Sequence, residues 1–162
     1  MAADPIRVLF LCTHNSARSQ MAEALLARIG GDRFEVFSAG TEATRVHPLA
    51  IRAMAEIGID ISRARSKHLD EFVGKDFDAV ITVCDSANES CPVFPWSPQR
   101  IHWSFPDPSA VDGAETERYR TFQRVRDAIA RHLRTWIASL DDSASISRHE
   151  RPGCDRSSTS RR

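Results

Sequence analysis

The feature that most constrains this chain is an apolar run at residues 6–11 that leads directly into a polar loop at residues 12–19. The run predicts a β-strand, and the residues after the loop have the spacing of an amphipathic helix. The loop begins with Cys12 and holds Arg18 after five intervening residues. A helix start offers unpaired backbone N–H groups and a positive dipole end, and arginine offers a planar, charged fork. The sequence therefore predicts a cradle for a tetrahedral oxyanion, with a thiol at its centre.

Cys12 is the candidate nucleophile of this cradle. The helix start and Arg18 both favour the thiolate, so we expect a lowered pKa and an ionised Cys12 at neutral pH. A thiolate inside an anion site predicts covalent chemistry on phosphate or on an anion of the same shape. The alternative is an ordinary strand–helix turn with a buried thiol. For Asn15 we expect mainly a backbone role, because asparagine tolerates the left-handed conformation that such a loop can need.

Composition narrows the class of partner. The 162 residues fit one domain and carry 22 basic and 22 acidic side chains, so the formal net charge is zero. This balance gives no electrostatic reason to expect nucleic acid or a membrane as partner. We find no signal-peptide pattern and no stretch near the ~20 apolar residues of a membrane span. We therefore expect a cytoplasmic protein whose four cysteines are reactive thiols or ligands rather than structural disulfides.

Strand and helix patterns alternate along the chain. Strands are expected at residues 6–11, 34–38, 79–84 and 101–103. Helices are expected after the first loop and at residues 48–57, 69–73 and 122–140. The alternation predicts an α/β fold with a doubly wound, four-stranded parallel sheet in the order 2-1-3-4.

The character of the sequence changes near residue 141. The last segment is rich in serine, arginine and aspartate, and Ile146 is its only aliphatic residue larger than alanine. Such a segment cannot bury enough apolar surface to offset the entropy of ordering. We therefore expect a catalytic domain at residues 1–140 and a disordered tail at residues 141–162, in which Cys154 is incidental.

Three reactive side chains fall where the expected strands end. In open α/β sheets, ligands bind beyond the carboxyl ends of the strands. Cys12 follows the first strand, Cys84 ends the third, and Asp107 follows the fourth. Neighbouring strands lie about 4.8 Å apart, so a loop could bring the Cys84 sulfur to Cys12. Asp107 is a candidate general acid at this edge, although it could simply begin a turn before Pro108.

Cys84 and Cys91 form a candidate redox pair. An extended chain between them would span roughly 23–25 Å, whereas a disulfide needs Cα atoms about 4.4–6.8 Å apart. Oxidation would therefore require a folded-back loop. A buried structural thiol at Cys84 is one alternative, and a zinc site is another. No second close pair of cysteines or histidines completes a zinc site, and His14 and His102 lack ligand spacing, so no metal is expected.

Further short motifs accompany these residues. They are Ser38-Ala39-Gly40-Thr41, His47-Pro48, Gly58-Ile59-Asp60-Ile61-Ser62, His102-Trp103-Ser104-Phe105, Asp107-Pro108 and residues 122–127. Together with the loop at residues 12–19, they resemble low-molecular-weight protein tyrosine phosphatases and the arsenate reductases built on their fold. The resemblance covers residues 6 to about 140. The pair Cys84 and Cys91 with the His-Trp-x-Phe motif points to the thioredoxin-coupled arsenate reductases.

The resemblance implies a low-molecular-weight phosphatase-like fold and a role for each loop residue. Cys12 would be the nucleophile, Arg18 the oxyanion clamp and Asp107 the general acid. The substrate would be bound by the loop residues Thr13, His14, Asn15, Ser16, Ala17, Arg18 and Ser19, and the Ser19 hydroxyl would also be a partner of the thiolate.

The three cysteines fit the reduction of arsenate to arsenite, a two-electron step that two thiols complete by forming a disulfide. Cys12 would displace an oxygen of arsenate while Asp107 protonates the departing hydroxide. Cys84 would then attack the Cys12 sulfur and expel arsenite, and Cys91 would move the disulfide to Cys84–Cys91. The expected partners are arsenate, with phosphate or sulfate as competing anions, and thioredoxin or another thiol reductant.

Two other functions remain open at this point. One is a phosphotyrosine or small-molecule phosphatase that uses Cys12, Arg18 and Asp107 alone. The other is a non-catalytic thiol or arsenite sensor. The cysteine pair favours the reductase, and the segment after Asp107-Pro108 lacks the aromatic residue that tyrosine phosphatases of this family usually place there. We expect no cofactor and a monomer.

One departure from the family concerns a monovalent-cation site that relatives can hold near the loop. Asn15, Glu23 and Ser38 match its ligands, but Lys67 stands where an acidic ligand would be expected. A lysine ammonium could replace the cation there. The resemblance, with this departure, therefore predicts weak or absent potassium dependence.

Overall fold

A computed structural model of the chain describes residues 4–84 and 99–149, with side chains up to residue 142. The strands are β1 (Ile6–Cys12), β2 (Phe34–Gly40), β3 (Ala79–Thr82) and β4 (Gln99–His102). The described α-helices are α1 (Arg18–Gly30), α2 (Pro48–Glu56) and α4 (Glu115–His149). Short 3₁₀ helices lie at η1 (Gly31–Arg33), η2 (Leu69–Phe72) and η3 (Pro108–Ala110). No helix within the described residues is long and apolar enough to cross a membrane.

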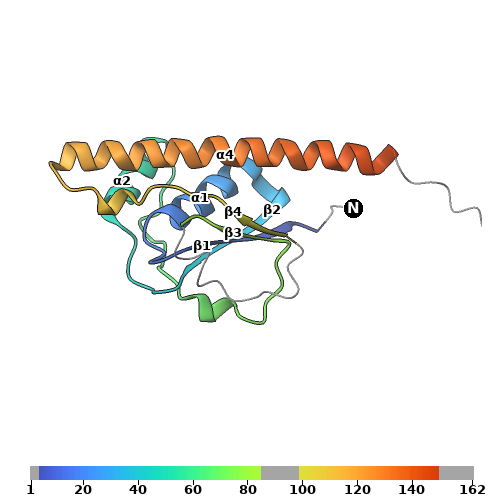
Figure 1. The fold of residues 1–162 in the computed structure, drawn as a ribbon, viewed down its shortest axis with the longest axis horizontal. Coiled ribbons are helices and arrows are strands. Elements are labelled where there is room, and N and C mark those ends of the chain that lie inside the picture. Colours follow the sequence, from blue (N-terminus) through green and yellow to red (C-terminus); the bar gives the residue numbers. More distant parts are fainter. Residues whose placement is uncertain (1–3, 85–98, 150–162) are drawn as a thin grey trace, which may run out of the picture.

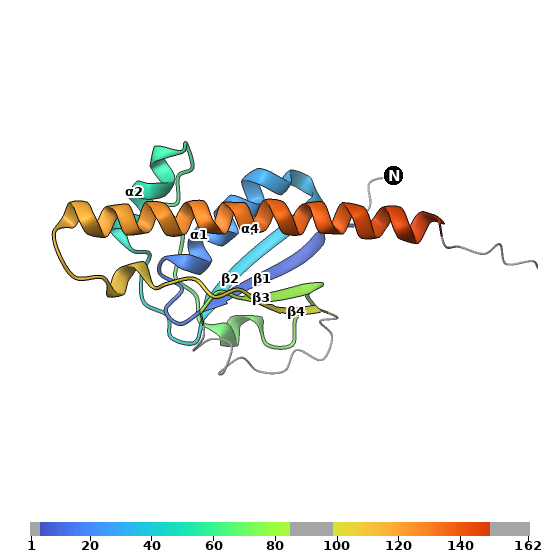
Figure 2. The same ribbon diagram turned by 45° about the horizontal axis from the view of Figure 1, so that its top comes forward.

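The four strands form one parallel sheet in the order β2-β1-β3-β4, which confirms the predicted topology. β1 lies between β2 and β3, where Val8 pairs with Val36 on one side and Ala79 on the other. The helices α1 and α4 lie on one side of the sheet, and η2 lies on the other (Figures 1 and 2). Because all strands run in the same direction, the carboxyl ends of β1 and β3 meet at one edge.

The core lies between the sheet and the helices. The helix α4 buries a stripe of side chains at steps of three or four, namely Phe122, Val125, Ile129, Leu133 and Trp136. α1 contributes Met21, Ala22, Leu25 and Leu26 to the same core, and α4 packs against both α1 and α2. Burial of each large apolar side chain stabilises the fold by about 1.5–3 kcal/mol, so this stripe anchors α4 on the sheet.

The helix α4 corrects the predicted domain boundary. It begins at Glu115 and continues to His149, so the expectation of disorder is wrong for residues 141–149, and the boundary after residue 140 falls inside a helix. Helix nucleation is the unfavourable step, and it has already occurred in the packed part of α4. Each residue that extends the helix beyond this part adds one backbone hydrogen bond. An ion pair of 2.8 Å between Arg33 and Asp141 also ties the helix to η1. Residues 150–162, including Cys154, lie outside the described residues.

The loop between β1 and α1 rests on the carboxyl end of β2. Thr41 N donates to Cys12 O at 3.2 Å, and Glu42 N donates to Thr13 O at 2.8 Å. At Gly40 the two segments are so close that a Cβ atom would lie 2.6 Å from Thr13 O and 2.7 Å from Asn15 N. These neighbours are backbone atoms, which cannot move aside as the end of a flexible side chain can. Gly40 therefore sets the position of the loop.

This contact predicts that Gly40→Ala displaces the loop. Overpacking against the backbone should lower the free energy of unfolding by about 1–3 kcal/mol. It should also weaken phosphate binding roughly tenfold, because the loop donors are then displaced from their positions. A tenfold loss corresponds to about 1.4 kcal/mol of binding free energy. Urea denaturation and titration calorimetry with phosphate measure the two effects.

Gly74→Ala is the matched control. Gly74 has a φ of 84° and no atom within 4 Å of an added Cβ, so this change strains the backbone without touching the loop. It should lower stability but leave phosphate affinity unchanged. Equal phosphate affinities in the two variants and the parent would contradict the role assigned to Gly40.

Candidate active site

The loop between β1 and α1 turns through one residue in the left-handed region. Asn15 has a φ of 49°, and it is the only non-glycine residue with positive φ in the described part of the chain, which confirms its expected backbone role. Asn15 N lies 3.2 Å from Cys12 Sγ and points toward it. The residue before α1 is Ala17, which offers no side chain to cap the helix. The first amides of α1 are therefore available to an anion.

Cys12 is almost fully buried, with 2% of its surface exposed. Its sulfur lies 2.7 Å from Ser19 Oγ. Burial raises the pKa of the Cys12 thiol above its ordinary value, and the hydrogen bonds with Ser19 and the charge of Arg18 lower it only in part. The prediction of a lowered pKa for Cys12 is therefore wrong. The helix start and Arg18 are visible in the sequence, but the depth at which the thiol lies depends on the packing of the whole sheet edge.

A buried amide network supports the thiol from behind. Asn15 Nδ2 donates to Ser19 Oγ at 2.8 Å and to Ser38 Oγ at 3.0 Å. Because Ser19 accepts this bond, its own hydroxyl proton is free to point at Cys12 Sγ. Asn15, Ser19 and Ser38 are all completely buried. Sequence reasoning expected a backbone role for Asn15, and no spacing in the sequence indicated that its side chain joins Ser19 to Ser38.

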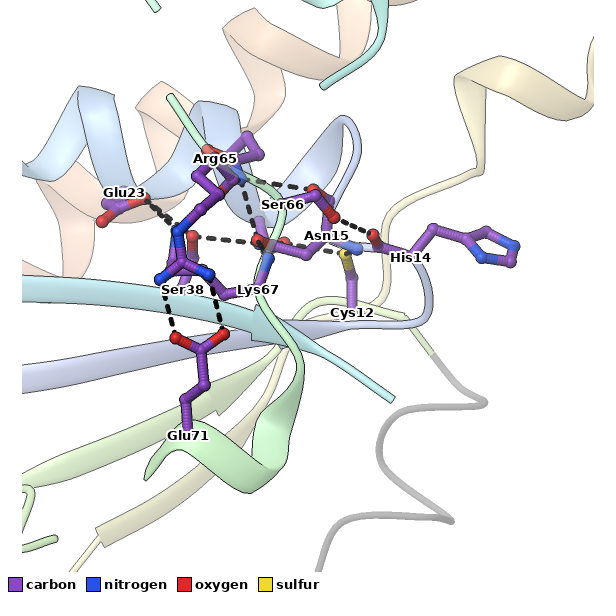
Figure 3. A network of polar contacts seen from close by, with 11 residues as sticks. Cys12, His14, Asn15, Glu23, Ser38, Arg65, Ser66, Lys67 and Glu71 are labelled. Atoms are coloured by element: carbon purple, nitrogen blue, oxygen red, sulfur yellow. Dashed lines mark hydrogen bonds and ion pairs between the residues drawn. The ribbon is translucent and has the colours of Figure 1, made fainter. Parts of the chain in front are cut away.

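Arg18 and Asp107 meet at the open side of the loop. Arg18 Nη2 lies 3.7 Å from Asp107 Oδ2, and Arg18 Nη1 donates to Phe105 O at 3.1 Å. Both residues line one small pocket together with Cys12, His14, Ser16, Ala17 and Ser109. The predicted convergence of Cys12, Arg18 and Asp107 is thus present in the structure. The His14 imidazole is directed away from Cys12 (Figure 3) and lies 3.5 Å from the Glu42 carboxylate.

Asp107 serves both as a turn residue and as part of the pocket. Its Oδ1 accepts hydrogen bonds from Ser109 N at 3.0 Å and from Ser109 Oγ at 2.7 Å, and it caps η3. Burial raises the pKa of Asp107, but the Ser109 hydrogen bonds and the nearby Arg18 charge outweigh that effect and hold it below its ordinary value. The two interpretations offered for this residue are therefore compatible.

The second thiol lies beside the same loop. Cys84 is buried, with 4% of its surface exposed, and its sulfur is 3.3 Å from Thr13 Oγ1. Cys12 and Cys84 are both free thiols. Residue 91 lies outside the described residues, so the structure does not place the predicted partner Cys91. Within residues 4–84 and 99–149, no group of three or more histidine, cysteine or acidic side chains could hold a metal ion.

A half-buried ion pair lies on the other side of the loop (Figure 3). Lys67 Nζ is 3.8 Å from Glu23 Oε2, and Ser38 Oγ donates to the same carboxylate oxygen at 2.7 Å. The Lys67 side chain is 14% exposed and the Glu23 side chain 26%. This pair therefore adjoins the buried network that ends at the Cys12 sulfur.

Known proteins resemble this chain over most of its length. The profile of the low molecular weight phosphotyrosine protein phosphatase family matches residues 7–146. An arsenate reductase from Halalkalibacterium halodurans is 44% identical over 129 residues, which make up 80% of this chain and 93% of that protein.

Solved structures agree with the sequence comparison. An arsenate reductase in the phosphate binding state superposes with a TM-score of 0.68 at 34% identity, covering 83% of this chain and 98% of that one. A thioredoxin-dependent arsenate reductase from Corynebacterium glutamicum superposes with a TM-score of 0.69 at 31% identity, covering 88% of this chain and 65% of that one. The signature loop, the strand order and these similarities lead to the same assignment. This chain belongs to the low molecular weight phosphotyrosine protein phosphatase family, on the branch formed by the arsenate reductases.

Proposed function

We propose that this protein reduces arsenate to arsenite with the thiols of Cys12, Cys84 and Cys91, and that thioredoxin then reduces the protein. The observation that carries the proposal is the second buried thiol, Cys84, in contact with the loop that surrounds Cys12. The relatives named as arsenate reductases, one of them thioredoxin-dependent, support the same reaction. A phosphatase needs only the first thiol, with Arg18 and Asp107.

Arsenate binding depends on fixed donors around Cys12. The uncapped amides of α1 and the Arg18 guanidinium offer hydrogen bonds to the oxygens of a tetrahedral anion. Phosphate has the same shape and charge, so we expect it to compete. The bound anion also adds negative charge beside Asp107, which favours the protonated carboxyl group that a general acid needs.

In the first chemical step the Cys12 sulfur attacks arsenic. A sulfur–arsenic bond forms, one arsenic–oxygen bond breaks, and the departing hydroxide takes a proton from Asp107 and leaves as water. Because burial raises the pKa of Cys12, its proton has to leave as the anion binds, and an oxygen of arsenate is a suitable base. The Ser19 hydroxyl, 2.7 Å from the sulfur, stabilises the thiolate that results.

In the second step Cys84 attacks the Cys12 sulfur. A Cys12–Cys84 disulfide forms, the sulfur–arsenic bond breaks, and its electron pair stays on arsenic, which leaves as arsenite. The Thr13 hydroxyl is placed to hold the Cys84 sulfur during this attack. Cys91 then attacks Cys84 and releases Cys12, and the two thiols of thioredoxin reduce the Cys84–Cys91 disulfide.

The relay is tested by replacing each cysteine with serine and following NADPH consumption with arsenate, thioredoxin and thioredoxin reductase. Cys12→Ser and Cys84→Ser should release no arsenite. Cys91→Ser should release about one arsenite per chain and then stop, because its Cys12–Cys84 disulfide cannot move on. Cys154→Ser is the matched control and should turn over like the parent. Hydrolysis of aryl phosphate that survives in Cys84→Ser and Cys91→Ser, without any NADPH consumption by the parent, would instead identify a phosphatase.

Asp107→Asn tests the general acid. Loss of proton donation should lower kcat for arsenate by about 10²–10⁴-fold. Phosphate affinity should stay equal or increase, because the substitution removes a negative charge 3.7 Å from Arg18. Steady-state kinetics and phosphate titration separate the two effects. A variant with the parent's kcat, or one that fails to bind phosphate, would contradict this role.

Ser19→Ala tests the hydrogen bond to the nucleophile. A bond to a thiolate is worth about 1.5–3 kcal/mol, so its loss should move the midpoint of Cys12 alkylation about one to two pH units higher. The direction follows because the Ser19 hydrogen bond lowers the pKa of Cys12 in the parent. The pH profile of iodoacetamide alkylation measures it, with Cys84, Cys91 and Cys154 changed to serine in all proteins. Ser109→Ala, which alters the pocket but not this bond, is the control; equal midpoints for all three proteins would exclude the effect.

A further inference from the structure

The Lys67 ammonium lies among oxygen atoms behind the loop. Its Nζ is 3.8 Å from Glu23 Oε2 and donates to Arg65 O at 2.9 Å. Burial lowers the pKa of Lys67 and raises that of Glu23, and the attraction between the two opposes both shifts. Removing one charge of this half-buried pair leaves the other without a counter-charge, which is destabilising. Each residue therefore needs the other to remain charged where it is.

A continuous series of hydrogen bonds connects this pair to the nucleophile. Ser38 donates to Glu23 at 2.7 Å, and Asn15 donates to Ser38 at 3.0 Å. Asn15 also donates to Ser19 at 2.8 Å, and the Ser19 hydroxyl is 2.7 Å from Cys12 Sγ. A displacement of the Glu23 carboxylate would thus reach the thiol through side chains that are completely buried.

Residues 65–67 contact the loop from the same side (Figure 3). Lys67 N donates to Asn15 Oδ1 at 2.8 Å, and Ser66 Oγ donates to His14 O at 2.9 Å. The Arg65 guanidinium binds both carboxylate oxygens of Glu71, at 2.9 and 2.6 Å. Residues 65–67 are therefore hydrogen-bonded to the loop, and the Lys67 side chain reaches Glu23 from this segment.

The oxygens around this position do not suit a resident monovalent cation. Asn15 Oδ1 already accepts hydrogen bonds from Lys67 N and from Gln20 Nε2, both at 2.8 Å. The Ser38 hydroxyl donates its proton to Glu23, and the Glu23 carboxylate is paired with the Lys67 ammonium. A second positive charge beside Lys67 would be repelled at this half-buried site. The residues that match a cation site by sequence are thus already occupied with one another.

We propose that the Lys67 ammonium is a built-in replacement for a monovalent cation, and that its pairing with Glu23 positions Asn15 and Ser19 around Cys12. Lys67 is a positioning residue, since it acts on the thiol through other side chains. Its benefit to catalysis rests on the proposed arsenate reduction. Its effect on the reactivity of Cys12 does not, and that effect can be measured without arsenate.

The test compares Lys67→Met, which removes the charge, with Lys67→Asp, which creates a site with two carboxylates. Lys75→Met is the matched control, because Lys75 is the only other lysine of the chain and its ammonium lies 5.4 Å from the centre of the Phe72 ring. All proteins carry serine at positions 84, 91 and 154. The measurement is the rate of Cys12 alkylation by iodoacetamide at pH 7, in potassium, sodium or choline chloride of equal ionic strength. Choline is too large to enter the position of the ammonium.

The parent and Lys75→Met should react at equal rates in all three salts. Lys67→Met should react roughly tenfold more slowly in every salt, because Glu23 loses its counter-charge. Lys67→Asp should be equally slow in choline and should recover roughly tenfold in potassium or sodium, as an ion fills the vacated position. A structural defect alone would not respond to the identity of the cation.

Several results would overturn the proposal. One is a parent rate that differs severalfold between potassium and choline, which would show that an external cation is needed. Another is a Lys67→Met rate equal to that of the parent. A third is a Lys67→Asp variant that is folded by circular dichroism but whose alkylation rate is the same in potassium, sodium and choline. If Lys67→Asp does not fold, the first two comparisons still decide, and none of the results depends on whether the protein reduces arsenate.

Discussion

The left-handed turn at Asn15 is the constraint on which the rest of the site depends. A non-glycine residue at a φ of 49° costs on the order of 1–3 kcal/mol, and glycine would avoid that cost. The Asn15 side chain offsets it, because its amide donates to Ser19 and Ser38 and its carbonyl oxygen accepts from Gln20 and Lys67. The same residue thus bends the loop around the Cys12 sulfur and fixes the hydroxyl that faces it. Glycine could do only the first of these.

The sequence predicted which residues would meet, because topology decides that question. The alternation of strands and helices predicts the strand order 2-1-3-4, and parallel strands bring their carboxyl ends to one edge. Cys12, Cys84 and Asp107 follow or end these strands, so they are expected at the same edge. Hydrophobic periodicity also located α4 on the core, through the stripe from Phe122 to Trp136. These features depend on spacing along the chain, which is visible in the sequence itself.

The features that were not predicted depend on depth and on contacts between distant residues. The sign of the Cys12 pKa shift follows from burial at 2% exposure, and no local motif reports how far a loop sinks into a protein. The contact of Thr13 with Cys84 joins residues 71 positions apart. The continuation of α4 to His149 reflects propagation from a packed helix. The composition of residues 141–149 predicts disorder because it takes no account of the helix that precedes them.

The shape of the loop cannot by itself separate arsenate from phosphate, since both are tetrahedral anions that suit the amides of α1 and the Arg18 guanidinium. The difference lies in what the central atom can accept. Arsenic in a sulfur adduct can take an electron pair when a second thiol attacks the first, and phosphorus in the same position is instead released by water. A second thiol beside the loop therefore allows the chemical step to distinguish arsenate from phosphate, which binding alone does not do. Cys84, held 3.3 Å from Thr13, stands where that selection would occur.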